Sequence, residues 1–291
     1  MKIALIGREK SGKTTVFNAL TGLSAATDLY CMRRSEPRTA SVRVVDPRIE
    51  RLAEIYHPRR VTHATLECMD FCGIREDSTE GKGVFSPSEL NLLRTADAFA
   101  VVLRNFHDTS IDASAGPCDP ETDYTAVRTE LALDDYILVQ TRLERIEEQT
   151  RKNLRNQALL VERDALAKIS PFLDDPDATP IPTLMQEEEK AIRGLRLLSL
   201  KPLLIVLNSD ENTFGSDPGL LERLERSSRV VEFAGKFEMD LTRLEPEEAR
   251  AFMDDMGIVS SARERLTRAA YDLLGYISFF TVGEDEVRAW T

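Results

Sequence analysis

The amino terminus of this chain carries the feature that most restricts its fold, the stretch MKIALIGREKSGKTT at residues 1–15. Residues 2–6 are a short apolar run rich in residues that favour β-strands, and an apolar pattern with helical spacing follows the stretch. Between them, the pattern G-x-x-x-x-G-K-[ST] is completed by Gly7, Gly12, Lys13 and Thr14. A strand, a glycine-containing loop and a helix in this order predict a phosphate-binding loop, the P-loop. An ordinary turn between a strand and a helix is the alternative.

Each residue of the motif has a chemical reason for its position. Gly7 allows the chain to leave the strand in a tight turn, and Gly12 lets backbone N–H groups approach phosphate oxygens. The helix that begins near Lys13 adds the positive end of its dipole. Lys13 can reach the β- and γ-phosphates as a point charge, and the Thr14 hydroxyl is short enough to ligate Mg²⁺. The motif therefore predicts a site for a nucleoside triphosphate with Mg²⁺.

The composition argues against a membrane protein. At 291 residues, with 42% hydrophobic and 30% charged residues, the chain is long enough for one large domain or two smaller ones. Its longest uninterrupted apolar run, residues 98–103, is far shorter than a transmembrane helix. Met1 opens directly into the first expected strand without a signal-peptide pattern, so we expect a cytoplasmic protein. The four cysteines are too sparse for a disulfide framework.

Charge is distributed unevenly along the chain. The net charge of −12 argues against nucleic-acid binding driven by the field of the whole protein. Residues 33–60, however, contain eight arginines and four acidic residues, whereas residues 119–190 contain nine basic and seventeen acidic residues. The arginine-rich 33–60 region is interpreted either as a solvated surface or as a surface that docks a partner or faces phosphates.

Strands and helices are expected to alternate along most of the chain. Apolar runs predict strands at residues 41–45, 64–69, 98–103, 203–207, 230–233 and 276–282, with helices at 48–56, 86–96 and 261–275. The helix after residue 86 opens with Ser-Pro-Ser-Glu, a capping box with proline at the first helical position. This alternation predicts an α/β fold with a doubly wound, mainly parallel sheet and a ligand site at the carboxyl ends of its strands.

A helical insertion interrupts the alternation. Residues 121–170 contain neither glycine nor proline, and apolar residues recur there at steps of three and four. Four prolines in residues 171–182 then break the pattern, and residues 185–198 resume it. Two ordinary surface helices are one interpretation. We expect instead an antiparallel helical coiled coil of residues 119–199, inserted into a P-loop domain of residues 1–118 and 200–291.

A second motif follows the expected strand after the P-loop helix. Asp70 stands at the carboxyl end of that strand, where a Mg²⁺-associated carboxylate belongs beside a P-loop strand. Gly73, three residues on, can bring its backbone N–H close to a γ-phosphate, which gives it a catalytic role alongside Lys13. Residues 25–38 and 74–85 are polar and turn-prone, and we expect them to be loops that switch with the nucleotide.

Four motifs occur in the order found in P-loop GTPases: Gly7–Thr14, Asp70–Gly73, Asn208–Glu211 and Ala234–Lys236. Their details resemble the YchF branch of the Obg-related P-loop GTPases, also called the Obg-like ATPases. The similar stretches are Glu36-Pro37, Asp46-Pro47-Arg48, Thr129-Glu130-Leu131-Ala132-Leu133, Arg142-Leu143-Glu144-Arg145, Phe279-Phe280-Thr281 and residues 286–291. This resemblance implies a P-loop domain with a coiled-coil insertion, binding and hydrolysis of ATP or GTP in the cytosol, and the ribosome as a candidate partner.

The resemblance also assigns roles to individual residues. It places Lys13 on the phosphates, Thr14 on Mg²⁺ and Asp70 on the water shell of the metal. It assigns Asn208 and Glu211 to the base. The full set of expected nucleotide-binding residues is Gly7, Lys10, Ser11, Gly12, Lys13, Thr14, Thr15, Asn208, Glu211, Ala234 and Gly235.

Departures from the GTPase pattern modify these expectations. Glu211 stands where most GTPases carry the aspartate that accepts from guanine, and its extra methylene displaces that acceptor, so guanine selectivity should be weak. Ile74 stands where many GTPases carry a glutamine that orients the attacking water. Arg34 replaces the switch threonine, so the usual second hydroxyl ligand of the metal is missing unless Ser35 or Thr39 substitutes for it. Hydrolysis should therefore be slow.

Further departures concern the P-loop and the end of the chain. Glu9 and Lys10 replace a proline and an asparagine of the family. Gly235 replaces an alanine in the last motif, which we expect to be a small change. The family continues beyond the Ala-Trp-Thr ending into a TGS domain, whereas this sequence ends at Thr291, so we expect a divergent member that lacks this module.

Three hypotheses about function follow. The first is a slow Mg²⁺-dependent ATPase or GTPase that acts as a conformational switch and presents its switch loops and the arginine-rich 33–60 region to a ribosomal or protein partner. The second is a nucleotide-binding interaction protein without hydrolysis, because Arg34 and Ile74 remove two groups that hydrolysis uses. The third is a P-loop phosphotransferase, for which the sequence contains no recognisable acceptor pocket.

Overall fold

A computed structural model describes residues 1–23, 37–74, 85–152, 156–241, 244–255 and 257–291. The chain divides into two compact units. As far as they are described, the first contains Met1–Ile74, Ala96–Asp123 and Pro202–Thr291, and the second contains Arg75–Thr95 and Tyr124–Lys201. The first unit holds the main sheet and the P-loop, and the second is helical.

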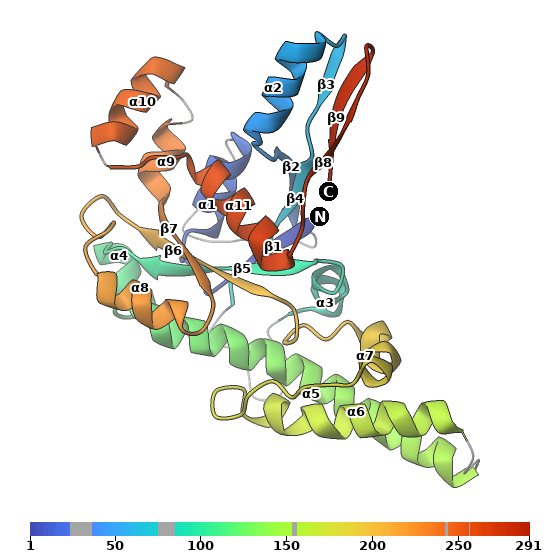
Figure 1. Ribbon diagram of the computed structural model, residues 1–291. Helices are drawn as coiled ribbons and strands as arrows, with labels where there is room; N and C mark the ends of the chain where they lie inside the picture. Colours follow the sequence, from blue (N-terminus) through green and yellow to red (C-terminus); the bar gives the residue numbers. More distant parts are fainter. Residues whose placement is uncertain (24–36, 75–84, 153–155, 242–243, 256) are drawn as a thin grey trace. The chain divides into compact units, whose positions relative to one another are not determined.

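Six strands form the main sheet, in the order β2-β4-β1-β5-β6-β7 (Figure 1). They are β1 (Lys2–Ile6), β2 (Arg38–Arg43), β4 (Thr65–Asp70), β5 (Ala98–Asn105), β6 (Leu203–Ser209) and β7 (Arg229–Ala234). All neighbours pair in parallel except β2, which runs antiparallel to β4 at one edge. This confirms the expected α/β fold, and it brings the carboxyl ends of the five parallel strands to one end of the sheet.

Helices cover the main sheet and bury the apolar side chains of its strands. Every residue of β5 from Ala98 to Leu103 is buried, as expected for a parallel strand covered on both faces. The helix α1 (Lys13–Thr21) packs against β1, β2 and β4, α11 (Ala262–Leu274) packs against β6 and β7, and α8 (Pro218–Glu225) packs against β7. Phe17 of α1 enters this core, but α1 ends at Gly22 with φ 72°, so Leu23 lies beyond the helix and is 52% exposed.

Two helices begin where their capping residues predict. The hydroxyl of Ser86 accepts from the backbone N–H of Glu89 at the start of α3 (Pro87–Leu93), and the Glu89 carboxylate accepts from the N–H of Ser86, which confirms the capping box. Ser261 caps α11 through the N–H of Glu264, and Gly275 ends α11 in the left-handed region. Four helices of the first unit were not predicted from the sequence. They are α8, α4 (Thr109–Ala115), α9 (Gly235–Leu241) and α10 (Pro246–Asp255).

A separate three-stranded sheet replaces the expected last strand of the main sheet. β8 (Phe279–Val282) pairs antiparallel with β9 (Glu286–Trp290), and β9 pairs in parallel with β3 (Arg60–Thr62). Val287 and Ala289 of β9 face the core, and α2 (Pro47–Tyr56) packs against β8 and β9. The prediction that residues 276–282 close the main sheet is wrong, because a turn in which Gly283 N–H donates to Glu286 O returns the chain as a hairpin.

The second unit contains two long antiparallel helices, α5 (Pro120–Lys152), which begins in the first unit, and α6 (Gln157–Asp174). They lie side by side in Figure 1, in green and yellow-green. Arg142 of α5 donates two hydrogen bonds to the carboxylate of Glu162 in α6, at 2.6 and 2.8 Å. Ile146 of α5 and Ala165 and Ile169 of α6 are fully buried in the core of this unit.

The two helices of this pair cover other residues than the sequence predicted. One helix over residues 121–170 was expected to pair with a second over residues 185–198, and this is wrong. A new helix begins after Asn156, whose side chain accepts from Leu159 N–H at 3.4 Å, so the pair is formed within the first of these stretches. The helix α6 also continues through Pro171, and α7 (Gln186–Ile192) is only two turns long.

A cluster of buried charges lies in the helical unit. Asp134 and Asp135 of α5 are buried, and Ser199 donates to Asp135 Oδ2 through both its N–H and its hydroxyl, each at 2.7 Å. Within the described part of the chain, Asp134 Oδ2, Asp135 Oδ1 and Arg94 Nε have no hydrogen-bond partner. Burial, followed by the charges of Asp135 and Glu130, raises the pKa of Asp134 to about 6, although Arg94 opposes the shift. Ionised Asp134 therefore destabilises the folded state at neutral pH.

We expect Asp134→Asn to increase the free energy of unfolding by about 2 kcal/mol at neutral pH and to have little effect near pH 4. The pKa of Asp134 is higher in the folded chain than in the unfolded chain. The stability linked to its proton is therefore present below the unfolded pKa and is lost as the pH rises through about 6. Urea unfolding followed by circular dichroism across this pH range measures the effect. Glu148→Gln, at an exposed position of the same helix, is the control. Parallel stability profiles for the wild type and Asp134→Asn would contradict the prediction.

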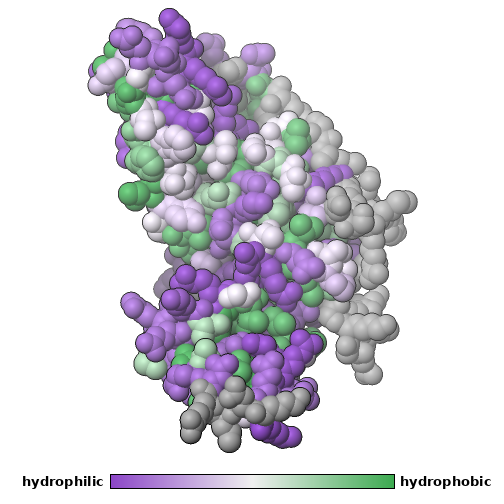
Figure 2. Space-filling view, turned by 90° about the vertical axis from the view of Figure 1, so that its right-hand side faces the viewer, coloured by the Kyte–Doolittle hydropathy of each residue, from purple (hydrophilic) through white to green (hydrophobic). Residues whose placement is uncertain are grey.

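Polar and apolar residues are interspersed on the face of the protein drawn in Figure 2. Figure 2 shows hydrophilic residues in purple and hydrophobic residues in green, mixed over the face that it draws. Among the helices that the structure describes, none is both long enough and apolar enough to cross a membrane.

Candidate nucleotide-binding site

The loop between β1 and α1 has a backbone that favours glycine at two positions. Gly7 adopts φ 146° and Gly12 adopts φ 89°, in a region that residues with a Cβ rarely occupy. A Cβ on Gly7 would clash with the carbonyl oxygen of Val102 in β5, and a Cβ on Gly12 would clash with the side-chain amide of Asn208. Close packing as well as conformation therefore requires both glycines of the motif.

Lys13 turns its ammonium group back onto this loop. Its side chain is buried, and Nζ donates to the carbonyl oxygens of Arg8 at 2.6 Å and Gly7 at 3.2 Å. The helix α1 begins at Lys13 with Gly12 as its N-cap, and Val16 N–H bonds back to Gly12 O. The ammonium group and the positive end of the α1 dipole therefore converge where the motif predicts phosphate. Lys10, Ser11 and Thr15 lie in the same loop and first helical turn, Lys10 with φ 64°.

The two predicted Mg²⁺ ligands are in contact. Thr14 Oγ1, in the first turn of α1, donates to Oδ2 of Asp70, the last residue of β4, at 3.1 Å. They meet because β1 and β4 are neighbouring parallel strands in which Leu5 lies opposite Asp70. Hydroxyl and carboxylate oxygens are the ligands that Mg²⁺ prefers, so this pair of side chains fits the ion.

The D-x-x-G segment packs against the P-loop. Ile74 N–H donates to Gly7 O, and Glu9 N–H donates to Ile74 O, both at 3.0 Å. Gly73 lies so near the loop that a Cβ would be 2.5 Å from Glu9 Cα, so glycine is required for this contact. The side chain of Ile74 is buried. Residues 24–36 and 75–84, which include Arg34, Ser35 and most of both expected switch loops, lie outside the described residues.

Asn208 connects the predicted base motif to the P-loop. From the carboxyl end of β6, its Nδ2 donates to the carbonyl oxygen of Ser11 at 2.9 Å. Its amide lies between Gly12 and Gly235, because a Cβ on either glycine would clash with it. Ala234 and Gly235 are buried at the junction of β7 and α9. An alanine at position 235 would therefore displace Asn208, so the departure at Gly235 is larger than we expected from the sequence.

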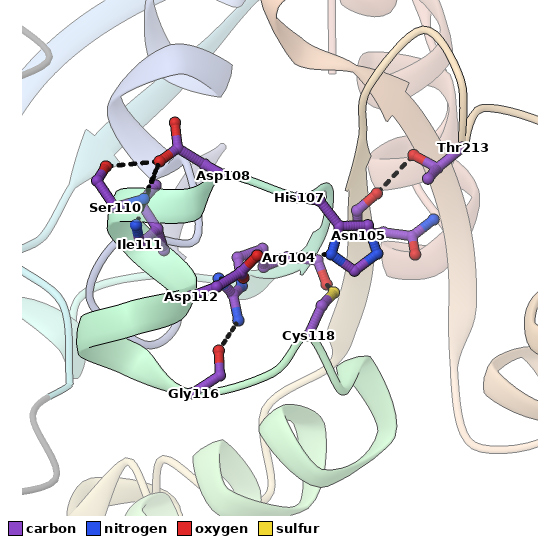
Figure 3. A network of polar contacts seen from close by, with 10 residues as sticks. All are labelled: Arg104, Asn105, His107, Asp108, Ser110, Ile111, Asp112, Gly116, Cys118 and Thr213. Atoms are coloured by element: carbon purple, nitrogen blue, oxygen red, sulfur yellow. Dashed lines mark hydrogen bonds and ion pairs between the residues drawn. The ribbon is translucent and has the colours of Figure 1, made fainter.

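Asp210 organises the loop that carries Glu211. Asp210 Oδ1 accepts from the N–H groups of Asn212 and Thr213, each at 2.9 Å. Thr213 Oγ1 donates to the carbonyl oxygen of Asn105 at the end of β5, at 2.6 Å (Figure 3). Burial favours the neutral acid, but the N–H donors outweigh it and keep the pKa of Asp210 below its usual value. Glu211 itself is exposed. The pattern Asp-x-x-Thr is a signal that could have revealed this turn.

A buried arginine, not recognised from the sequence, fixes the connection from β5 to α5. Arg104 Nη1 pairs with Asp112 of α4 at 2.8 Å, and Nη2 donates to the carbonyl oxygen of Gly116 at 2.6 Å (Figure 3). Cys118 Sγ donates to the carbonyl oxygen of Arg104 at 2.9 Å. These contacts hold the chain against the carboxyl end of β5 and so determine where α5 begins.

Comparison with known proteins finds relatives along the whole chain. A protein of Haemophilus ducreyi named Ribosome-binding ATPase YchF is 34% identical over 297 residues, covering 100% of this chain and 80% of the relative. A protein of Bacillus subtilis with the same name is 30% identical, covering 99% of this chain and 80% of the relative. No family model matches the chain. The solved structure of the Schizosaccharomyces pombe YchF GTPase aligns with 100% of this chain and 80% of its own, at a TM-score of 0.80 and 26% identity.

Proposed function

This chain belongs to the YchF family, and from that premise we propose that it is a slow, Mg²⁺-dependent nucleoside triphosphatase that takes ATP or GTP. The observation that carries the proposal is the set of contacts around the P-loop. Lys13 and Asn208 donate to carbonyl oxygens of the loop, and Thr14, which follows the loop directly, donates to Asp70. These residues come from three separate motifs. They correspond to the three parts of the ligand, which are the phosphates, the metal and the base.

The chemistry would consist of positioning and charge stabilisation. Lys13 and the amino-terminal end of α1 would balance the charge on the phosphates, and Gly73 N–H would donate to the γ-phosphate. Thr14 would hold Mg²⁺ directly and Asp70 would hold it through water. When bound, Mg²⁺ supplies positive charge beside the β- and γ-phosphates.

Phosphate release from ATP and from GTP, with Mg²⁺ and again with EDTA, tests this function. We expect turnover on the order of 10⁻² s⁻¹ or slower with Mg²⁺ and none with EDTA. Turnover is slow in this proposal because Ile74 offers the attacking water no hydrogen-bonding group. Equal phosphate release with and without EDTA would argue against the metal site.

Nucleotide binding without hydrolysis is the second candidate function. The buried side chain of Ile74 and the two backbone hydrogen bonds between Ile74 and the P-loop favour it, because they keep an apolar group where GTPases use a water-orienting one. Saturable nucleotide binding, with phosphate release no faster than that of a Lys13→Ala variant, would select this function over the first.

We expect Glu211→Asp to shift the ratio of ATP to GTP affinity toward GTP by about five-fold, or about 1 kcal/mol. The shorter side chain would return the carboxylate to the position from which GTPases accept guanine hydrogen bonds. Competition titrations with the two nucleotides measure the ratio. Glu222→Asp, on the exposed face of α8, makes the same change in side-chain length away from the loop. An unaltered ratio in Glu211→Asp would show that Glu211 does not contact the base.

The partner in this proposal is the ribosome, since the H. ducreyi and B. subtilis relatives are named ribosome-binding ATPases. In the described part of the arginine-rich 33–60 region, five arginines are exposed: Arg43, Arg48, Arg51, Arg59 and Arg60. The last four pair with Asp46, Glu54, Asp285 and Glu286 respectively, so phosphate groups of a partner would compete with these ion pairs. The proposal also includes a cytoplasmic location. The protein would act as a conformational switch, and its residues 119–199 would form a helical insertion in the P-loop domain. Co-sedimentation with ribosomes, with and without nucleotide, tests the association.

A further inference from the structure

An ion pair joins the P-loop to the start of α5. Arg8, the second residue of the P-loop motif, donates from Nη1 to Asp123 Oδ1 at 2.8 Å. The two side chains are 20% and 14% exposed, so the pair is partly shielded from water. A charged hydrogen bond in such a place is stronger than one on an open surface. Asp123 lies in the first turn of α5, far from Arg8 in the sequence.

Arg8 is directly connected to the groups that would bind phosphate. Its carbonyl oxygen accepts from Lys13 Nζ at 2.6 Å. Its two neighbours, Gly7 and Glu9, form the backbone hydrogen bonds to Ile74. A displacement of the Arg8 backbone would therefore move a carbonyl group that holds Lys13 and disturb the contact between the P-loop and the D-x-x-G segment.

Other contacts hold the same turn of α5 without involving the P-loop. Glu121 pairs with Arg223 of α8 at 3.1 Å, and both side chains are about half exposed. Asp119 Oδ1 accepts from Thr122 N–H at 3.1 Å and so caps the helix. These contacts anchor the helix to its surroundings, whereas the Asp123 ion pair extends to the predicted phosphate site.

We propose that Asp123 is a positioning residue for the nucleotide site, which acts through Arg8 and couples nucleotide binding to the order of the first turn of α5. The inference rests on the proposed function. Coupling of this kind is reciprocal: if bound nucleotide stabilises the ordered turn by some factor, the ordered turn strengthens nucleotide binding by the same factor. The helix α5 continues from this turn into the second unit.

Hydrogen exchange of the backbone amides of residues 121–128, with and without ATP and Mg²⁺, tests the coupling. In the wild type we expect the nucleotide to slow exchange about five-fold or more. Asp123→Asn should abolish this response and weaken ATP binding about five-fold. Glu121→Gln is the matched control, because it removes one carboxylate from the same turn and breaks an ion pair that does not reach the P-loop. Its exchange response should remain. Asp123→Glu, which keeps the charge, should restore part of the response.

Equilibrium titration with ATP and GTP is carried out first on each variant, and circular dichroism checks the folding. If the wild type binds neither nucleotide, both the proposed function and the coupling are overturned. If it binds ATP but exchange in residues 121–128 does not change, or changes equally in Asp123→Asn, only the coupling is overturned. Arg8→Gln removes the other side chain of the ion pair, and it replaces Asp123→Asn in the exchange experiment if that variant does not fold. Loss of the exchange response in Arg8→Gln supports the coupling, and an intact response contradicts it.

Discussion

Lys13→Ala is expected to lower the affinity for ATP and GTP at least about 100-fold, or about 2.7 kcal/mol, and to reduce phosphate release to the level of buffer. The ammonium group of Lys13 is buried and hydrogen-bonded to two carbonyl oxygens of the loop, so it occupies a defined position at the predicted site. Alanine removes this charge and both hydrogen bonds to the loop. Nucleotide titration and a phosphate-release assay measure the two effects.

Lys190→Ala is the control for this variant. Lys190 is an exposed lysine of α7 in the helical unit, so its loss removes the same charge from the protein without changing the loop. We expect its affinity and turnover to equal those of the wild type. If Lys13→Ala protein released phosphate as fast as the wild type, the P-loop would not be the site of hydrolysis.

Gly12→Ala is expected to reduce nucleotide affinity by about 100-fold or more and to lower the free energy of unfolding by about 1–3 kcal/mol. Two causes add here. The backbone of Gly12 has φ 89°, which is strained for alanine, and the new methyl group would clash with the Asn208 amide. Movement of Asn208 would break its hydrogen bond to Ser11 and so separate the base motif from the P-loop. Titration and thermal unfolding measure the two changes.

Gly22→Ala is the control, because it introduces the same kind of backbone strain without a clash at the nucleotide site. Gly22 ends α1 at φ 72°, but the nearest heavy atom to a Cβ there is 3.8 Å away, in the flexible side chain of Arg263. This variant should therefore lose stability while it retains nucleotide affinity. Equal affinities for Gly12→Ala and the wild type would show that the close packing between Gly12 and Asn208 has no role in binding.

The parts of the structure that could be predicted from the sequence depend on residues close together in the chain. The P-loop motif, the D-x-x-G motif and the Ser86–Glu89 capping box each involve a few consecutive positions, and each forms the expected local structure. The contact of Thr14 with Asp70 follows once two parallel strands that each end in a motif become neighbours. Alternation of strands and helices predicted the six strands of the main sheet, but it wrongly added residues 276–282 to them.

The parts that could not be predicted depend on contacts between distant segments or on weak local signals. The strand β3 has three residues and finds its partner β9 more than 220 positions later, so no local pattern indicated the second sheet. The boundary before α6 contains neither glycine nor proline, and Asn156 is its capping residue, so the helical pair was assigned to the wrong stretches. The packing of Asn208 between two glycines is visible only in three dimensions.

The candidate site shows the same distinction. From the sequence we predicted site residues that carry charge or hydroxyl groups in motifs, such as Lys13 and Thr14. It did not identify the side chains that hold the loops in place, among them Arg104, Asp210 and Asp123. These residues act through hydrogen bonds to backbone groups or to partners elsewhere in the fold, and a charged residue outside a motif carries no sequence signal that separates it from the many charged residues on the surface.

Equilibrium titration of the purified protein with labelled ATP and labelled GTP, in the presence of Mg²⁺, tests most directly whether the amino-terminal loop holds a triphosphate. We expect saturable binding of at least one of the two nucleotides at one site per chain, retained in Lys190→Ala and lost in Lys13→Ala. Binding of neither nucleotide, or equal binding by wild-type and Lys13→Ala protein, would contradict the central claim.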